Sequence, residues 1–238
     1  MEGYTKGNLP MYAAYNDVLK RLKEERGRLK LTQREMSGCA RMSQANYNKV
    51  ETGNRRLNYY EVKCLCDSNV DVHYVFTGLK CNDEFRGFFL QYSYTELMSL
   101  LNILTSVAEM RDHNRAVNRW HRLLWYAELF RIVGEERRPD SGVFLNLRRS
   151  LGCNQQVMAQ KLGVDVKKLR DLENGRCLPD SELLCRLYTI FGVCPAVVLK
   201  DRNCLSSEIG CLLDGYDFDA AEVVFQILKS IQELPKAL

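Results

Sequence analysis

The segment TQREMSGCARMSQANYNKVETG, residues 32–53, decides the fold. Thr32 followed three residues later by Glu35 is a capping box, which predicts that a short helix begins here. Ser43 is a second N-cap residue, and Gly53 is typical of the position just after a helix. The segment therefore predicts two short helices joined by a tight turn.

A second segment, NQQVMAQKLGVDVKKLRDLENG at residues 154–175, has the same frame. Gln33 precedes Glu51 by 18 residues (51 − 33), and Gln155 precedes Glu173 by the same 18 (173 − 155). The two segments lie 122 residues apart (155 − 33). A fixed offset between similar segments indicates duplication of one structural unit.

Apolar residues at helical spacing surround both segments, and no segment alternates in the manner of a strand. We therefore expect an all-α fold in which each half has five small helices and a longer C-terminal one. In the first helix of the first half we expect Tyr15, Val18, Leu19 and Leu22 to be buried. In the second half we expect buried Phe144, Leu147 and Leu151 in the first helix, and buried Val157, Met158 and Leu162 in the second.

The duplication extends toward the end of each half. Residues 88–95 can be laid over residues 212–219 at an offset of 124 (212 − 88), so that Thr95 and Asp219 each precede a longer helix as its cap. The apolar faces of these helices also align, with Leu100, Ile103, Leu104 and Val107 matching Val224, Ile227, Leu228 and Ile231.

The chain length of 238 residues has room for two domains. We expect a first domain at 1–110, with its motif at about 32–53, and a second at 143–238, with its motif at about 154–175. Residues 111–142 are interpreted as a connecting helix followed by a polar linker.

Bulk composition is that of a globular protein, with 46% hydrophobic and 27% charged residues. The net charge of +4 is compatible with a nucleic-acid partner but is weak support for one. No apolar run is long enough for a membrane span, and the N-terminus lacks the apolar region of a signal peptide. We expect a cytoplasmic protein without membrane contact.

Metal and catalytic motifs are not recognisable. The ten cysteines form no C-x-x-C pair, and the three histidines, His73, His113 and His121, have no H-x-x-x-H spacing. Reduced, buried, structural cysteines are the favoured interpretation, and a thiol-sensing role is the alternative. Since no nucleophile–base pair or phosphate loop stands out, we expect no enzyme, no metal and no cofactor.

Together these residues resemble the lambda-repressor-like (Xre-type) helix-turn-helix family of bacterial and phage transcription regulators. The resemblance covers about half the chain, roughly residues 18–78 and 144–200. It rests on Thr32-Gln33, the helix after Ser43, Val50-Glu51-x-Gly53, Asn154-Gln155, Ala159, Leu162-Gly163-Val164, Leu172-Glu173-Asn174-Gly175 and Pro179. The first copy departs from the family at Arg41, where glycine is preferred, and has about one extra residue before Thr32.

The resemblance implies a fold of two lambda-repressor-like helix-turn-helix bundles, each reading the major groove through the N-terminal part of its second motif helix. Base edges would be contacted by Gln44, Ala45, Asn48 and Lys49 in the first copy, and by Lys167 and Arg170, flanked by Val166 and Asp171, in the second. Phosphates would be contacted by Gln33, Ser43, Asn46, Arg55, Arg56, Gln155, Lys168 and Arg176. Glu51 and Glu173 are expected to brace an arginine or a backbone N–H inside each bundle.

These roles predict a sequence-specific double-stranded DNA-binding transcription regulator, and a repressor is the favoured interpretation. Family members usually dimerise, whereas here one chain supplies both modules. A homodimer through the connecting or C-terminal helices stays open, as does the nature of any small-molecule effector. The alternative is a protein-interaction, adaptor or antitoxin-like protein whose second copy no longer binds DNA, because Asp171 and Val166 suit protein contact better than base reading.

Overall fold

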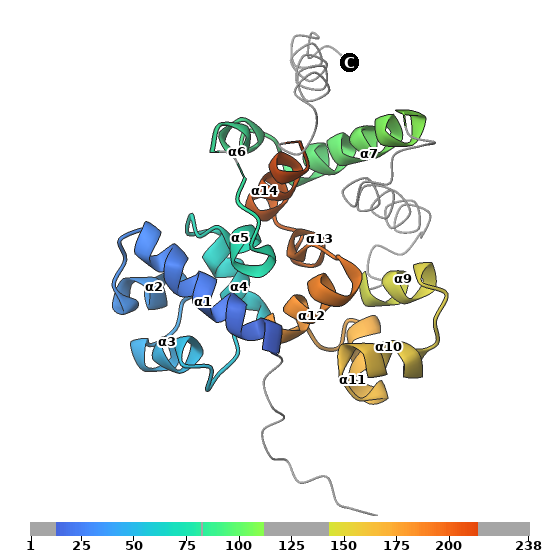
Figure 1. Ribbon diagram of the computed structural model, residues 1–238. Helices are drawn as coiled ribbons and strands as arrows, with labels where there is room; N and C mark the ends of the chain where they lie inside the picture. Colours follow the sequence, from blue (N-terminus) through green and yellow to red (C-terminus); the bar gives the residue numbers. More distant parts are fainter. Residues whose placement is uncertain (1–12, 82, 112–142, 214–238) are drawn as a thin grey trace, which may run out of the picture.

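The computed structural model of the chain describes residues 13–81, 83–111 and 143–213. Within these ranges it has thirteen helices and no strand (Figure 1), which confirms the all-α prediction. The helices of the first half are α1 (Ala13–Arg28), α2 (Gln33–Cys39), α3 (Gln44–Glu51), α4 (Tyr59–Cys66), α5 (Val72–Thr77), α6 (Asp83–Phe89) and α7 (Tyr94–Arg111). Those of the second are α9 (Val143–Ser150), α10 (Gln155–Leu162), α11 (Val166–Glu173), α12 (Ser181–Phe191), α13 (Pro195–Leu199) and α14 (Arg202–Leu213). None of the described helices has the length and apolar character needed to span a bilayer.

Side-chain caps begin α2 and α3 where the sequence predicts them, and a similar cap begins α4. The Thr32 hydroxyl accepts from the Glu35 backbone N–H, and the Glu35 carboxylate accepts from the Thr32 N–H, which completes the capping box. Ser43 caps α3, and Asn58 caps α4 with its own capping box. Each cap satisfies N–H groups that have no partner inside the helix, and so fixes where the helix begins.

The second half repeats these boundaries. Asn154, Asp165 and Asp180 cap α10, α11 and α12 through their side-chain oxygens, in each case accepting from the backbone N–H three residues later. Cys194 precedes α13, which starts with Pro195 at a position where a missing N–H costs nothing. The α2–α3 and α10–α11 pairs lie on either side of α12, in the part of the molecule away from α6 and α7 (Figure 1).

The turns inside these two helix pairs differ at one matched position. Arg41 and Gly163 occupy the same place in the repeat (163 − 41 is 122), and both have left-handed backbone, with φ of 52° and 62°. Glycine adopts this conformation without strain, whereas a side chain makes it costly. The second half therefore has the residue suited to the turn, and the first half does not.

Exchanging residues at this matched position should move stability in opposite directions. We expect Arg41→Gly to raise the free energy of unfolding by about 1 kcal/mol, because it relieves the left-handed strain. Gly163→Ala should lower it by about 1 kcal/mol or more, since its Cβ would also lie 1.9 Å from Nη1 of Arg186. Chemical denaturation measures both. Gly38→Ala, within α2 and with no atom within 4 Å of the added Cβ, is the control and should not destabilise.

One continuous apolar core runs through both halves. The predicted stripe of α1 is buried, as are Phe144, Leu147, Met158 and Leu162. Two core predictions are wrong: Val157 is 39% exposed and Leu151 is 37% exposed. Leu151 lies in the turn after α9, and Val157 is on the outer side of α10 while the adjacent Met158 points inward.

The ends of the two halves differ from the predicted pattern. Ser93 rather than Thr95 caps α7, because Ser93 and Glu96 exchange backbone and side-chain hydrogen bonds. Leu100 is buried, but Ile103 is 42% exposed. The short helix α6 and the twelve-residue helix α14 were not predicted. The connecting helix and the C-terminal helix after Asp219 lie outside the described residues.

Polar contacts join the halves beside the shared core. The Ser181 backbone N–H donates to Leu57 O at 2.9 Å, and the Leu57 N–H donates to Ser181 Oγ at 3.0 Å. The hydroxyl groups of Tyr15 and Ser181 share a 2.5 Å hydrogen bond, and Arg56 pairs with Glu182. Since these groups are at the starts of α1, α4 and α12, they fix the first half against the second at the base of α12.

Candidate nucleic-acid interface

A buried carboxylate holds α2 against α3. Arg26 Nε donates to Glu51 Oε1 at 2.8 Å, and Gln33 Nε2 donates to Glu51 Oε2 at 2.7 Å. Arg26 Nη1 also donates to Leu31 O at 3.1 Å, which ties the loop before α2 to the same group. Glu51 is only 4% exposed, so both of its oxygens find partners inside the protein.

The second half has the same arrangement at the equivalent residues. Arg148 Nε donates to Glu173 Oε1 at 2.5 Å, and Gln155 Nε2 donates to Glu173 Oε2 at 2.7 Å. Arg148 Nη1 donates to Cys153 O at 3.3 Å, as Arg26 does to Leu31. All three residues follow their counterparts by 122 positions (148 − 26, 155 − 33, 173 − 51). The expectation that both glutamates brace an arginine is confirmed.

This Arg–Gln–Glu triad defines the relation between two helices. The glutamine is the first residue of α2 or α10, and the glutamate is the last of α3 or α11. Each glutamine amide uses one N–H for the glutamate, and an amide group has a second N–H to offer. The predicted phosphate contacts of Gln33 and Gln155 are therefore compatible with the bracing role, since both glutamines are only half-buried.

The charge state of Glu51 gives the triad a pH dependence. Burial alone would raise the pKa of this carboxyl, but hydrogen bonds from Arg26 and Gln33 outweigh it and hold the pKa below its ordinary value of 4.5. The stabilisation is thus present above that ordinary value and is lost as the pH falls through the lower folded-state pKa.

We therefore expect the stability of wild type to fall between about pH 5 and about pH 3 more steeply than that of Glu51→Gln. The variant has no carboxyl at this place to protonate, so that part of the pH dependence should be missing. Urea denaturation of both proteins across the range measures the difference. Parallel stability curves for the two proteins would contradict the role given to Glu51.

The outer face of α3 presents the predicted base-reading residues together. Gln44, Ala45, Asn48 and Lys49 are all exposed, whereas Tyr47 and Val50 on the opposite face are buried. The positions follow the helical repeat, so the four side chains share one surface. This face offers amide donors and acceptors beside one cation, which matches the groups that read base edges.

The corresponding face of α11 has a different chemistry. Lys167 and Arg170 are exposed, Val166 is half-buried, and Asp171 is half-buried with an Oδ1 that lies 3.9 Å from Nη1 of Arg176. This ion pair reduces the negative charge that Asp171 would otherwise present to a phosphate backbone. Of the predicted phosphate contacts, Lys168 lies 3.7 Å from an Asp180 carboxylate oxygen.

The predicted phosphate contacts after α3 already have carboxylate partners. Both terminal nitrogens of Arg55 donate to the Glu61 carboxylate, at 3.0 and 2.5 Å. Arg56 pairs with Glu182 of the second half. The Ser43 hydroxyl caps α3, and Asn46 is half-buried. These partners place Arg56 in the junction between the halves, a role that the sequence did not indicate.

A group of potential metal ligands was missed by sequence reasoning. Donor atoms of His73, Cys194 and Glu208 lie within 4.8 Å of one another, and all three residues are buried. Burial would lower the pKa of His73, but its hydrogen bonds with Cys211 and Glu208 outweigh this effect and raise it to about 9. The three residues are 135 positions apart at their extremes (208 − 73), so no local spacing marks them.

Comparison with known proteins adds no relative to this picture. No protein-family model, curated protein or solved structure matches the chain. The resemblance to Xre-type regulators therefore remains a prediction.

Proposed function

We propose that each half of the chain contains a helix-turn-helix module and that the protein is a sequence-specific double-stranded DNA-binding transcription regulator, acting as a repressor in the cytoplasm. The repeated Arg–Gln–Glu triad is the observation that carries the proposal. It joins the two helices of each pair at equivalent atoms in both halves and leaves the face of α3 exposed. A reading helix needs this combination of a rigid support and a free outer face.

In the first module, α3 enters the major groove. The Gln44 amide has the donor and acceptor geometry to pair with adenine, and the Lys49 ammonium suits guanine O6 and N7. Asn48 stands one helical turn after Gln44 and reads a neighbouring base. The second N–H of Gln33, at the N-terminus of α2, contacts a phosphate and sets the register of α3 on the duplex.

In the second module, Lys167 and Arg170 take the reading positions on α11. The Asp171–Arg176 pair lowers the cost of bringing a carboxylate near phosphate, and Gln155 repeats the contact proposed for Gln33. The polar junction at Ser181 gives the two reading helices a defined relation, so one chain performs the task for which related regulators use a dimer. We also propose that two copies of the chain form a homodimer through the connecting or C-terminal helices.

The proposal is tested by fluorescence anisotropy with labelled duplex DNA of random sequence and with duplexes enriched from that pool. We expect enriched duplexes to bind at least about 1000-fold more tightly than random ones at moderate salt. Affinity for both should fall linearly on a log–log plot against salt, since phosphate contacts release counterions. Equal affinity for enriched and random duplexes would contradict a sequence-specific reader.

A second candidate function is supported by apolar residues on the outside of the second module. Val157 and Leu178, which are 39% and 45% exposed, stand where the first module has Glu35 and Arg56 (each 122 positions earlier). Polar residues have thus been exchanged for apolar ones on this surface. Such a change favours contact with a protein, so the second module is also a candidate adaptor surface.

A further inference from the structure

Three donor side chains of different chemistry meet at the junction of the halves. His73 belongs to α5 of the first half, whereas Cys194 caps α13 and Glu208 lies in α14 of the second. His73 and Cys194 are fully buried, and Glu208 is 1% exposed. An imidazole nitrogen, a thiol sulfur and a carboxylate oxygen thus lie within 4.8 Å of one another in a site closed to bulk water.

The donor set matches the preference of Zn²⁺, which takes histidine nitrogen at about 2.0–2.1 Å, thiolate sulfur at about 2.3 Å and carboxylate oxygen at similar lengths. The distances between the three donor atoms are at most 4.8 Å, so small shifts of the side chains bring them to the spacing of ligands around one tetrahedral ion. With a neutral imidazole, a thiolate and a carboxylate, the charges of ligands and ion sum to zero. A neutral assembly is the form in which charged groups tolerate complete burial.

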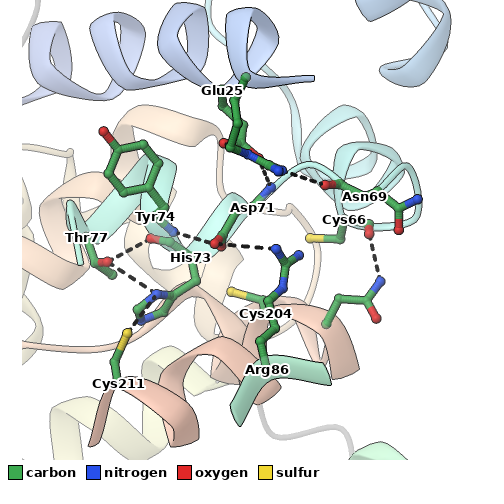
Figure 2. A network of polar contacts seen from close by, with 12 residues as sticks. Glu25, Cys66, Asn69, Asp71, His73, Tyr74, Thr77, Arg86, Cys204 and Cys211 are labelled. Atoms are coloured by element: carbon green, nitrogen blue, oxygen red, sulfur yellow. Dashed lines mark hydrogen bonds and ion pairs between the residues drawn. The ribbon is translucent and has the colours of Figure 1, made fainter. Parts of the chain in front are cut away.

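The surroundings of His73 orient its ring for this role (Figure 2). The Thr77 hydroxyl donates to the His73 carbonyl oxygen at 2.8 Å, and its oxygen lies 3.5 Å from His73 Nδ1. Cys211 Sγ lies 4.0 Å from the same nitrogen, so Nδ1 has two polar neighbours that hold the ring. Nε2 faces Glu208 at 2.6 Å and is the nitrogen that binds an ion. Histidine ligands commonly have such a partner on the second nitrogen.

We propose that His73, Cys194 and Glu208 bind one Zn²⁺ ion that links the two halves of the chain. The Cys204 thiol lies beside Cys194, outside the group of three donors. On binding, the ion displaces the proton shared by His73 and Glu208 and the proton of the Cys194 thiol, and these two protons pass to solvent. No electron is transferred. The three ligands belong to α5, α13 and α14, so zinc binding does not depend on α3 or α11.

The test uses the full chain, freed of metal with a chelator and kept reduced. We expect it to bind Zn²⁺ at one ion per chain and to unfold at a higher temperature with the ion than without it. Titration with Co²⁺ should give an absorption band from thiolate-to-cobalt charge transfer, which only a cysteine-bound ion produces. A metal-free protein whose melting temperature and absorption do not respond to either ion would overturn the proposal.

Variants locate the site. Cys194→Ser exchanges sulfur for oxygen with little change of volume. It should lower the affinity for Zn²⁺ by at least about 100-fold and weaken the cobalt band. The reason is that loss of a residue that merely hydrogen-bonds to a metal ligand already lowers metal affinity by about 10- to 100-fold. Cys185→Ser is the control, because Cys185 is equally buried in α12 but is outside this group. Circular dichroism verifies that both variants fold without metal. Equal metal affinity in the two serine variants would contradict the assignment of Cys194 as a zinc ligand.

Discussion

Replacement of Glu51 by alanine lowers the free energy of unfolding by about 3 kcal/mol, because it removes the carboxylate of a largely buried ion pair and leaves two donors without their acceptor. Arg26 and Gln33 both donate to this carboxylate, and Arg26 would keep only its bond to Leu31 O. Since the triad joins α2 to α3, the variant should also bind DNA more weakly while still folded. Urea denaturation and DNA anisotropy of the same sample measure both effects.

Glu24→Ala is the matched control for this variant. Glu24 is on α1, is 45% exposed at its side chain, pairs with Lys20 at 3.9 Å and accepts a hydrogen bond from Tyr74 Oη at 2.6 Å. Since both contacts are exposed to solvent, its removal should lower stability by only about 1 kcal/mol. The DNA affinity of Glu24→Ala should equal that of wild type. If Glu51→Ala were as stable as Glu24→Ala, the triad would not be the support of the α2–α3 pair.

The double variant Gln44→Ala/Lys49→Ala is expected to lose about 2–6 kcal/mol of specific binding energy, a loss of affinity of roughly 30-fold or more, at unchanged stability. Both side chains are exposed on α3, so the folded protein does not depend on them. Binding to random duplexes should fall much less, because phosphate contacts supply most of it. Anisotropy on enriched and random duplexes separates the two quantities.

A second double variant, Lys23→Ala/Gln91→Ala, removes one lysine and one glutamine from exposed positions outside α3 and α11. It matches the loss of charge and amide groups, so it corrects for general effects of both. The specific affinity of this control should stay within about twofold of wild type, in line with the small worth of isolated exposed charges. An equal loss in the two double variants would mean that α3 does not read bases.

Local signals made the helix boundaries predictable. Thr32 and Ser43 were recognisable as caps because a capping side chain bonds within three residues of its own position. The spacing of Gln33 and Glu51 was also visible, and its repetition gave the first indication that the two residues act together. An arginine partner for Glu51 was expected, but the sequence did not show which arginine it is. Arg26 lies on another helix and meets Glu51 only in the folded protein.

The contacts between the two halves could not be predicted from local sequence patterns. Ser181 meets Tyr15 and Leu57, and His73 meets Glu208, over more than a hundred positions of chain. Hydrophobic periodicity indicates which face of a helix is buried, but it does not say which distant helix covers it. The wrong core assignment of Val157 has a different origin, because the adjacent Met158 satisfies the helical pattern equally well and is the residue that faces the core.

Selection of binding sites from random duplex DNA by the full-length protein, followed by the same selection with Gln44→Ala/Lys49→Ala and with Lys167→Ala/Arg170→Ala, addresses the tandem arrangement. We expect wild type to select a motif with two parts at fixed spacing, and each double variant to lose a different part. The spacing then reports how the junction at Ser181 sets α3 relative to α11. Selection of no motif by wild type, with weak binding that ignores sequence, would contradict the tandem DNA reader.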